Sequence, residues 1–428
     1  MNNPRRTFLK TGLSAGLGSA GIGTTLLPPL SAAGQPAPPE ALKADYAKLD
    51  AALAKPVLKK ELFADPVIIE SCELLEYQGN YLCRVRSTDG AEGYCVGHNI
   101  RMPHLYPIQL MLVNPYFVGK DARELDQLIE GVFMHQNNYK YQGYTLWIPV
   151  ATVEMAVLDM LGRIARKSMG ELIGDIHNTE IAIYQANNNR GKSAEESLEN
   201  IKALQAETNA KAVKFKIGGR RSNPEVPAGR TERLIPMMRP AFGDDITLYA
   251  DCNGSYGAPE AIRIGKLLEA NDIDLFEQPV PTDWYEDWKQ TADALTISIA
   301  SGGGEVSLRN FRWLIGNEAV QMVQQDLFYF GGMIRCMRVA RMAEAKGYPC
   351  TPHISGTGLG YIYMMQFVSA LPNAGPFHEF KGVSTEVPFE CATSSLKPED
   401  GILHLPKGIG SGVEIDPDFI AKHRVLRS

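Results

Sequence analysis

Three acidic residues stand at the ends of apolar runs and recur along the chain at nearly equal intervals. They are Asp251 in ITLYADCNG, Glu277 in IDLFEQP and Glu305 in TISIASGGGE. One strand, one helix and their two loops occupy about 30 residues in a parallel β/α barrel, which matches this spacing. Successive strands would then bring the three carboxylates to one end of a barrel. Convergent carboxylate oxygens suit a hard divalent cation, so the pattern predicts a Mg²⁺ site.

A lysine pair ends the apolar run one unit upstream of these acids. Lys214 and Lys216 lie in KAVKFKIGG, and side chains two apart in a strand point to the same face. A lysine must be neutral to accept a proton, and burial and a neighbouring cation each lower its pKa. Lys216 is therefore a candidate base. Two solvated lysines before a glycine turn are the alternative interpretation.

An aspartate and a histidine follow the next two apolar runs. Asp326 lies in VQQDLFYFGG and His353 in YPCTPHISG. An aspartate beside a histidine orients the imidazole and raises its basicity. The pair could therefore act as a second base or as a general acid, although a histidine after proline is by itself more often structural.

The order and spacing of these residues resemble the enolase superfamily, and within it the mandelate racemase and muconate lactonizing enzyme-like proteins. The resemblance covers roughly residues 60–390. Its motifs are K-x-K at Lys214 and Lys216, D-x-N-G at Asp251, E-x-P at Glu277, Gly-Glu at Glu305, Asp326 with Gly331-Gly332, and His353.

The resemblance implies a role for each residue. Lys216 would act on one face of a substrate and His353 on the other, while Lys214 would contact the substrate carboxylate. Glu379, in FHEFKG, matches a position where the family often carries a carboxyl donor to that carboxylate. The implied catalytic residues are Lys216, His353, Lys214, Asp326 and Glu379, and the implied metal ligands are Asp251, Glu277 and Glu305.

The chemistry that suits this set is removal of a proton next to a carboxylate. The resulting enediolate is too basic to form freely in water, and a bound cation stabilises its charge. If His353 then protonates a leaving β-hydroxyl, an acid sugar is dehydrated to a 2-keto-3-deoxy acid. If His353 instead returns a proton to carbon, the centre is racemised or epimerised. The resemblance favours dehydration, and the motif permits both.

Alternating strand and helix patterns supply the frame for these residues. Strands alternating with helices favour a parallel sheet closed into a barrel, with an open doubly wound sheet as the competing topology. We expect an α/β protein, a modified TIM barrel of (β/α)7β type with an α+β capping domain. The predicted barrel strands are 181–186, 211–216, 246–251, 273–277, 296–300, 320–325, 348–352 and a short one near 375–380.

The domain organisation follows from composition and pattern. Residues 34–60 predict a linker and a short helix, and 61–178 a capping domain that begins with strands at 67–77, 80–90 and 91–97. The barrel is expected over 179–380. The segment 381–428 is expected to return to the capping domain.

Residues 1–33 have the features of a twin-arginine signal peptide. Arg5 and Arg6 precede a weakly apolar stretch and a small-residue site near Ala33. Pro28 and Pro29 argue against a stable membrane-spanning helix. We therefore expect export by the twin-arginine route to a bacterial periplasm. A disordered basic tail is the alternative.

The composition limits the partners. The chain has 428 residues, 44% hydrophobic and 21% charged, as in soluble globular proteins, and its formal charge of −6 provides no basic face for nucleic acid. We expect a small-molecule carboxylate substrate, no membrane in the mature form and a homo-oligomer. The seven cysteines include no C-x-x-C pair, so zinc is not expected, and buried thiols are favoured over a disulfide between Cys72 and Cys83.

Two further observations bear on the substrate and on other functions. Polar residues at 187–190 and 98–101 favour a hydroxylated acid, and the insert GGRRSNPEVPAGR after Lys216 is expected to reshape the pocket rim or an oligomer contact. A non-catalytic periplasmic binding protein is a second hypothesis, disfavoured because the whole residue set is present. A metal-dependent hydrolase would need several histidine ligands, and no H-x-H follows the first barrel strand.

Overall fold

A computed structural model describes residues 40–221, 223–354, 358–383 and 386–427. The expected signal peptide, residues 1–33, and the start of the expected linker lie outside these ranges. Helix α1 (Glu40–Leu53) occupies part of the segment 34–60. Residues 40–428 form one compact unit, so the domain boundaries expected inside it remain predictions.

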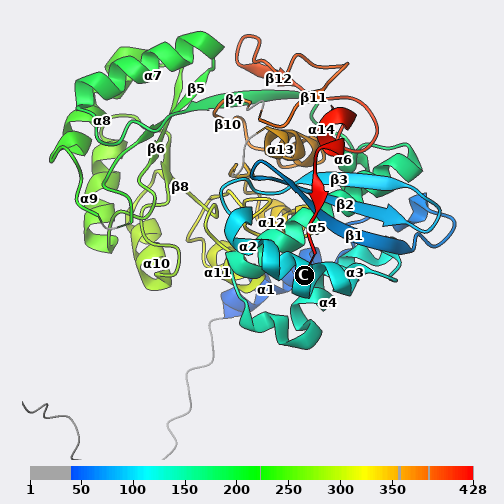
Figure 1. Ribbon diagram of the computed structural model, residues 1–428. Coiled ribbons are helices and arrows are strands. Elements are labelled where there is room, and N and C mark those ends of the chain that lie inside the picture. Colours follow the sequence, from blue (N-terminus) through cyan, green and yellow to red (C-terminus); the bar gives the residue numbers. More distant parts are fainter. Residues whose placement is uncertain (1–39, 222, 355–357, 384–385, 428) are drawn as a thin grey trace, which may run out of the picture. The chain divides into compact units, whose positions relative to one another are not determined.

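A curved parallel sheet is the frame of the barrel (Figure 1). Its strand order is β10-β4-β5-β6-β7-β8-β9, and β12 (Ile402–His404) pairs antiparallel with β4. The strands are β4 (Glu180–Ala186), β5 (Ala212–Lys216), β6 (Thr247–Asp251), β7 (Leu275–Glu277), β8 (Ser298–Ser301), β9 (Met322–Val323) and β10 (His378–Phe380). They confirm seven of the eight predicted barrel strands, in the predicted order.

The predicted strand 348–352 is reduced to isolated bridges. Cys350 bridges Val323 on one side and Ala374 on the other, both in parallel. Pro349 and Pro352 carry no N–H, so the ladder cannot extend along this segment. Because β10 pairs with β4, these bridges link the last strands to the first in a (β/α)7β ring.

Helices alternate with these strands and cover the outside of the sheet. They are α7 (Ala194–Thr208), α8 (Arg230–Phe242), α9 (Ala258–Glu269), α10 (Tyr285–Ala294), α11 (Leu308–Gly316), α12 (Met333–Ala345) and α13 (Leu359–Ser369). Val213 and Phe215 of β5 lie in one buried cluster with Leu234 of α8. Lys214 and Lys216 alternate with them and so face the interior of the ring.

An antiparallel meander follows α1, as predicted. Strands β1 (Ile69–Tyr77), β2 (Asn80–Ser87) and β3 (Glu92–Val96) pair in sequence, and β14 (Arg424–Val425) pairs with β1. The helices that follow are α2 (Met102–Ile108), α3 (Asn114–Phe117), α4 (Leu125–Met134), α5 (Tyr144–Ala165) and α6 (Met169–Ile173). The remaining short elements are β11 (Phe389–Glu390), β13 (Glu414–Ile415) and α14 (Pro417–Ala421).

Helix α5 packs on β2 and β3. Among the described residues it is the one helix long and apolar enough to cross a membrane, but 94% of its apolar window is buried inside the protein. A helix that is apolar all round is expected in a core, and α5 is such a core helix.

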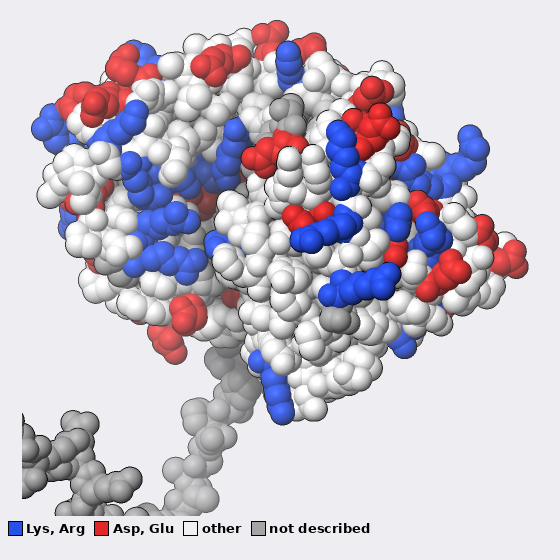
Figure 2. Space-filling view, in the orientation of Figure 1, with Lys and Arg blue, Asp and Glu red and all other residues white. Residues whose placement is uncertain are grey.

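The seven cysteines are all free thiols. In the register of β1 and β2, Cys72 lies opposite Val85 and Cys83 opposite Leu74, so the two cysteines are diagonal rather than facing. On the face shown in Figure 2, basic and acidic side chains are mixed, with several basic groups gathered where Figure 1 has β6 and β8.

Candidate active site

Parallel register brings the ends of neighbouring strands level. Lys216 of β5 pairs with Asp251 of β6, Asp251 with Glu277 of β7, and Glu277 with Ala300 of β8. Paired residues in parallel strands point to the same side of the sheet. The structure therefore brings Lys216, Asp251 and Glu277 together inside the ring, at the carboxyl ends of the strands.

Lys214 is the centre of a buried charge cluster. Its Nζ lies 2.9 Å from Glu277 Oε2, 2.9 Å from Glu379 Oε1 and 3.8 Å from Asp251 Oδ2, and it donates to the Tyr184 hydroxyl at 3.1 Å. Burial opposes the charge of the Lys214 ammonium, but the carboxylates of Glu277 and Glu379 outweigh it and hold its pKa well above the ordinary value. The cluster therefore favours the charged form of Lys214.

Lys216 lies beside this cluster, but its pKa is shifted in the opposite direction from that of Lys214. Its ammonium forms an ion pair with Asp251 and lies 3.5 Å from Asn253 Oδ1. Burial lowers the pKa of Lys216, the positive charge of Lys214 lowers it further, and the attraction of Asp251 does not compensate. The structure thus favours loss of a proton from Lys216 rather than from Lys214, which suits a base at this position.

Glu305 is not brought together with Asp251 and Glu277. Its Oε1 accepts from the N–H groups of Val306 at 2.7 Å and Ser307 at 2.8 Å, and its Oε2 accepts from the Tyr285 hydroxyl at 3.1 Å. The carboxylate therefore binds the backbone of the turn just before α11, whose own N-cap is Ser307. Over the described ranges no three Asp, Glu, His or Cys side chains meet closely enough to hold a metal ion. The expected convergence of three carboxylates is not met in this structure, and the ligand role of Glu305 remains a prediction.

Asp326 and His353 form the expected pair. Asp326 Oδ2 lies 2.7 Å from His353 Nδ1, and its Oδ1 accepts from the N–H groups of Phe328 and Tyr329, both at 2.9 Å. The buried carboxylate is thus held from both sides and fixes the orientation of the imidazole. With Nδ1 engaged, Nε2 is the nitrogen left for proton exchange.

Glu379 lies on β10, with its carboxylate beside the Lys214 ammonium. Besides Lys214, it contacts Lys381 Nζ at 3.1 Å and accepts from the Ile354 N–H at 3.1 Å. Burial opposes its charge, but Lys214 and Lys381 keep the pKa of Glu379 well below the ordinary value. His378 precedes it on the strand and so points to the opposite side of the sheet.

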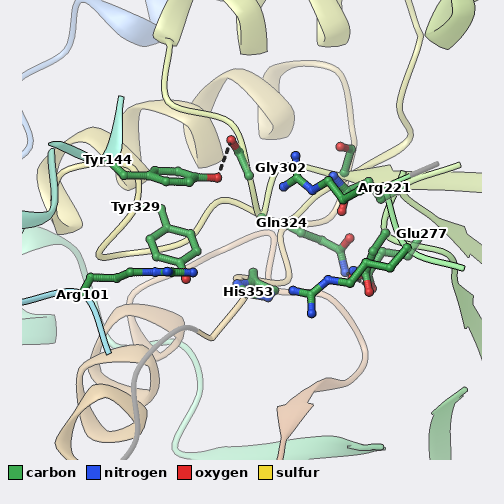
Figure 3. Close-up of a pocket in the computed structure, with 14 residues that line it drawn as sticks. Arg101, Tyr144, Arg221, Glu277, Gly302, Gln324, Tyr329 and His353 are labelled. Carbon is green, nitrogen blue, oxygen red and sulfur yellow. Dashed lines mark hydrogen bonds between the residues drawn. The ribbon is translucent and has the colours of Figure 1, made fainter. Parts of the chain in front are cut away.

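A cavity of about 130 Å³ opens beside Glu277, Gln324 and His353 (Figure 3). Tyr144 and Tyr329 form one wall, with ring centroids 4.5 Å apart. The loop of Gly302, Gly303 and Gly304 passes beside Tyr144, whose hydroxyl donates to the Gly304 carbonyl at 3.0 Å, and a Cβ added at Gly303 would lie 3.0 Å from the His353 ring. Glycine therefore lets this loop pass close to the imidazole.

Sequence reasoning missed several residues of the cavity. Gln324 donates to Glu277 Oε2 at 3.0 Å, and its position two residues before Asp326 was a usable signal, because alternation places both on one face. Tyr144 offered none, since an aromatic residue at the start of an apolar helix is typical of core packing. Arg220 and Arg221 were seen only as part of a charged insert, yet both line the cavity.

Comparison with known proteins places these observations in a family. A model of the enolase C-terminal domain-like family matches residues 196–419. Arabinonate dehydratase from Saccharolobus solfataricus is 25% identical over 334 residues, which cover 77% of this chain and 87% of that protein. D-galactarolactone cycloisomerase from Agrobacterium fabrum is 25% identical over 363 residues, which cover 81% of this chain and 92% of that protein.

A solved structure shows the same fold. The mandelate racemase/muconate lactonizing protein from Paracoccus denitrificans, complexed with magnesium, superimposes with a TM-score of 0.75 at 21% identity. The match covers 84% of this chain and 99% of that one.

Proposed function

The chain belongs to the enolase C-terminal domain-like family, and from that premise we propose that it is an enzyme that dehydrates an acid sugar to a 2-keto-3-deoxy acid. One observation carries the proposal: the buried Lys214–Glu277–Glu379 cluster and the Asp326–His353 pair lie on the same rim of the barrel. The similarity to an arabinonate dehydratase supports dehydration as the outcome.

The protein side chains have separate tasks in this reaction. Neutral Lys216 accepts the proton next to the substrate carboxylate on its Nζ. Protonated His353, held through Nδ1 by Asp326, gives a proton from Nε2 to the β-hydroxyl. The C–O bond breaks, water leaves, and the resulting enol tautomerises to the 2-keto acid. Lys214 binds the substrate carboxylate, and Glu379 holds the Lys214 ammonium in place.

Mg²⁺ is the cation that we propose for this site. Asp251 and Glu277 would hold it, with Glu305 as a third ligand after its side chain leaves the N–H groups of Val306 and Ser307. All three are hard oxygen donors, and burial raises the pKa of Glu277 and of Glu305, so added positive charge would stabilise both carboxylates. When bound, Mg²⁺ would supply positive charge beside the substrate carboxylate.

A screen of acid sugars in D2O tests the reaction. With Mg²⁺ present, NMR should show a 2-keto-3-deoxy product from at least one acid. Deuterium at the α-carbon without loss of water would instead indicate the racemase or epimerase alternative. If no acid in a broad panel exchanges or loses water, a non-catalytic binding protein becomes the better interpretation.

Two variants test the assigned roles. Lys216→Ala and His353→Asn should each lower dehydration by about 10²–10⁴-fold, the usual contribution of a positioned acid or base. Lys202→Ala, at an exposed position on α7, serves as the control and should keep wild-type activity. Equal activity of all three variants would contradict the assignment.

We also propose that the protein is exported by the twin-arginine route and acts in the periplasm as a homo-oligomer. The support is the sequence of residues 1–33 for export, while the expectation of a homo-oligomer, without nucleic-acid or membrane partners, rests on composition and family resemblance. Replacement of Arg5 and Arg6 by lysine should leave the protein in the cytoplasmic fraction. Light scattering of the mature protein would measure its subunit number.

A further inference from the structure

Three arginines line the cavity together with the residues of the proposed reaction. Arg101 belongs to the loop between β3 and α2, and Arg220 and Arg221 belong to the insert that follows β5. Arg101 and Arg221 reach into the cavity from different sides (Figure 3). All three side chains are exposed, and no carboxylate of the described part of the chain lies within ion-pair distance of them.

The backbone holds Arg220 and Arg221 in an unusual conformation. Their φ angles are 68° and 55°, in the left-handed region that residues other than glycine seldom occupy. The Arg220 N–H donates to Ser255 Oγ at 2.8 Å, and the Arg221 N–H donates to the Asn253 carbonyl at 3.2 Å. Strained backbone of this kind persists only where its surroundings fix it, and it gathers at functional sites.

These two hydrogen bonds fix the backbone of Arg220 and Arg221 relative to the strand end that carries Asp251. Asn253 and Ser255 belong to the loop that directly follows Asp251. The Arg221 guanidinium also lies over the glycine loop, because a Cβ added at Gly304 would lie 3.6 Å from its Nη2 and 3.2 Å from the Tyr144 hydroxyl. The insert therefore delivers positive charge to the cavity beside Tyr144 and the glycine loop.

Within the ranges that the structure describes, the acidic residues of the proposed reaction do not form ion pairs with these arginines. The carboxylates of Asp251, Glu277 and Glu379 form ion pairs with Lys214, Lys216 and Lys381, so in this structure they do not neutralise the arginines. Three guanidinium groups then remain around the cavity. Arginine presents a planar fork of donors that matches a carboxylate or a phosphate group.

We propose that Arg101, Arg220 and Arg221 form a second anion subsite, so that the substrate is a dianionic acid sugar. Its first carboxylate lies beside the proton that is removed, and a second acidic group, a terminal carboxylate or a phosphate, binds the arginines. This inference rests on the proposed function for the identity of the first carboxylate.

Relative affinity tests the subsite without requiring turnover. Calorimetry in the presence of Mg²⁺ would compare gluconate with glucarate and 6-phosphogluconate, and galactonate with galactarate. The wild-type protein should bind at least one dianion about ten-fold or more tightly than its monoanionic counterpart. A preference for glucarate over 6-phosphogluconate would identify a carboxylate subsite, and the reverse a phosphate subsite. This advantage should shrink as salt is added, because the arginines are exposed.

Matched variants test whether the preference for dianions depends on Arg220 and Arg221. Arg221→Met and Arg220→Met should remove the advantage of the dianion and leave monoanion binding within about two-fold of wild type. Arg166→Met is the control, because Arg166 is also exposed with a positive φ of 54° but does not line the cavity. Thermal unfolding would confirm that all variants fold.

The inference is overturned if no dianion binds more tightly than its monoanion in either series. It is equally overturned if the Arg220 and Arg221 variants weaken both classes alike, or if Arg166→Met has the same effect. A dianion preference without any dehydration would retain the subsite and reject the proposed function. If the protein dehydrates monoanions but shows no preference for dianions, the proposed function is retained and the subsite is rejected.

Discussion

Glu305 shows how one residue can serve two interactions that exclude each other. In the structure its carboxylate accepts from the N–H groups of Val306 and Ser307, in the turn directly before α11. Cation binding would require the carboxylate to turn towards Asp251 and Glu277. Gly302, with a φ of 134°, begins the three-glycine stretch before it and gives that segment unusual backbone freedom.

The substitution Glu305→Gln separates the two interactions. The amide oxygen can still accept from the N–H groups of Val306 and Ser307, so the melting temperature should stay close to that of the wild type. The negative charge is lost, so the Kd for Mg²⁺, measured by calorimetry, should rise about ten-fold or more. Unchanged Mg²⁺ affinity would exclude Glu305 as a ligand, and Asp251→Asn provides the positive control.

Period-two alternation was sufficient to predict the direction of Lys214 and Lys216, because both lie inside a regular strand. The recurrence of strands was sufficient to predict the barrel and the level of Asp251 and Glu277. The direction of Glu305 could not be predicted in this way, since it follows a glycine loop and its side chain is held by Tyr285 and by the N–H groups of the next two residues. The positions of Arg220 and Arg221 could not be predicted for a similar reason: their N–H groups donate to Ser255 and Asn253, which lie far along the chain, and no local pattern encodes those contacts.

At the scale of elements, α5 fixes the helix that follows Asp326. Glu154 is a fully buried acid within α5, and its two oxygens accept from the N–H groups of Met333 at 3.0 Å and Ile334 at 2.7 Å. Those N–H groups begin α12 and would otherwise lack partners. Gly332 allows this approach, because an added Cβ there would lie 2.3 Å from the Glu154 carboxyl group.

The substitution Glu154→Gln should weaken this junction between α5 and α12. The amide NH2 replaces one acceptor, so one buried N–H of α12 faces a donor. The free energy of unfolding, measured in urea, should fall by about 1–3 kcal/mol, the usual range for an unsatisfied buried group. Glu70→Gln, at an exposed position on β1, should change it by less than about 0.5 kcal/mol. A similar small change at Glu154 would show that the junction does not depend on this contact.

At the scale of the whole molecule, His378 makes stability depend on pH. It is buried behind β10, and burial lowers its pKa to about 4. The unfolded chain binds this proton near pH 6.5, whereas the folded protein binds it only near pH 4. The contribution of His378 is therefore fully present above pH 6.5 and is lost as the pH falls towards 4, by about 3 kcal/mol.

Urea unfolding from pH 4 to 8 would measure this contribution. His378→Gln should flatten the decline in unfolding free energy between pH 6.5 and 4 relative to the wild type, whatever its stability at pH 8. His404→Gln, an exposed histidine on β12, should leave the decline unchanged. Parallel curves for the wild type and the His378 variant would contradict the assignment.

The pairing of β14 with β1 has a consequence for biosynthesis. The edge of the N-terminal meander is contributed by residues 424 and 425, about 350 positions later in the chain. At a synthesis rate of roughly 5–20 residues per second, the ribosome needs tens of seconds to make the intervening segment. During that time β1 exposes unpaired N–H and C=O groups to other nascent chains. A chaperone that shields this edge should raise the yield of folded protein more than one that acts after release.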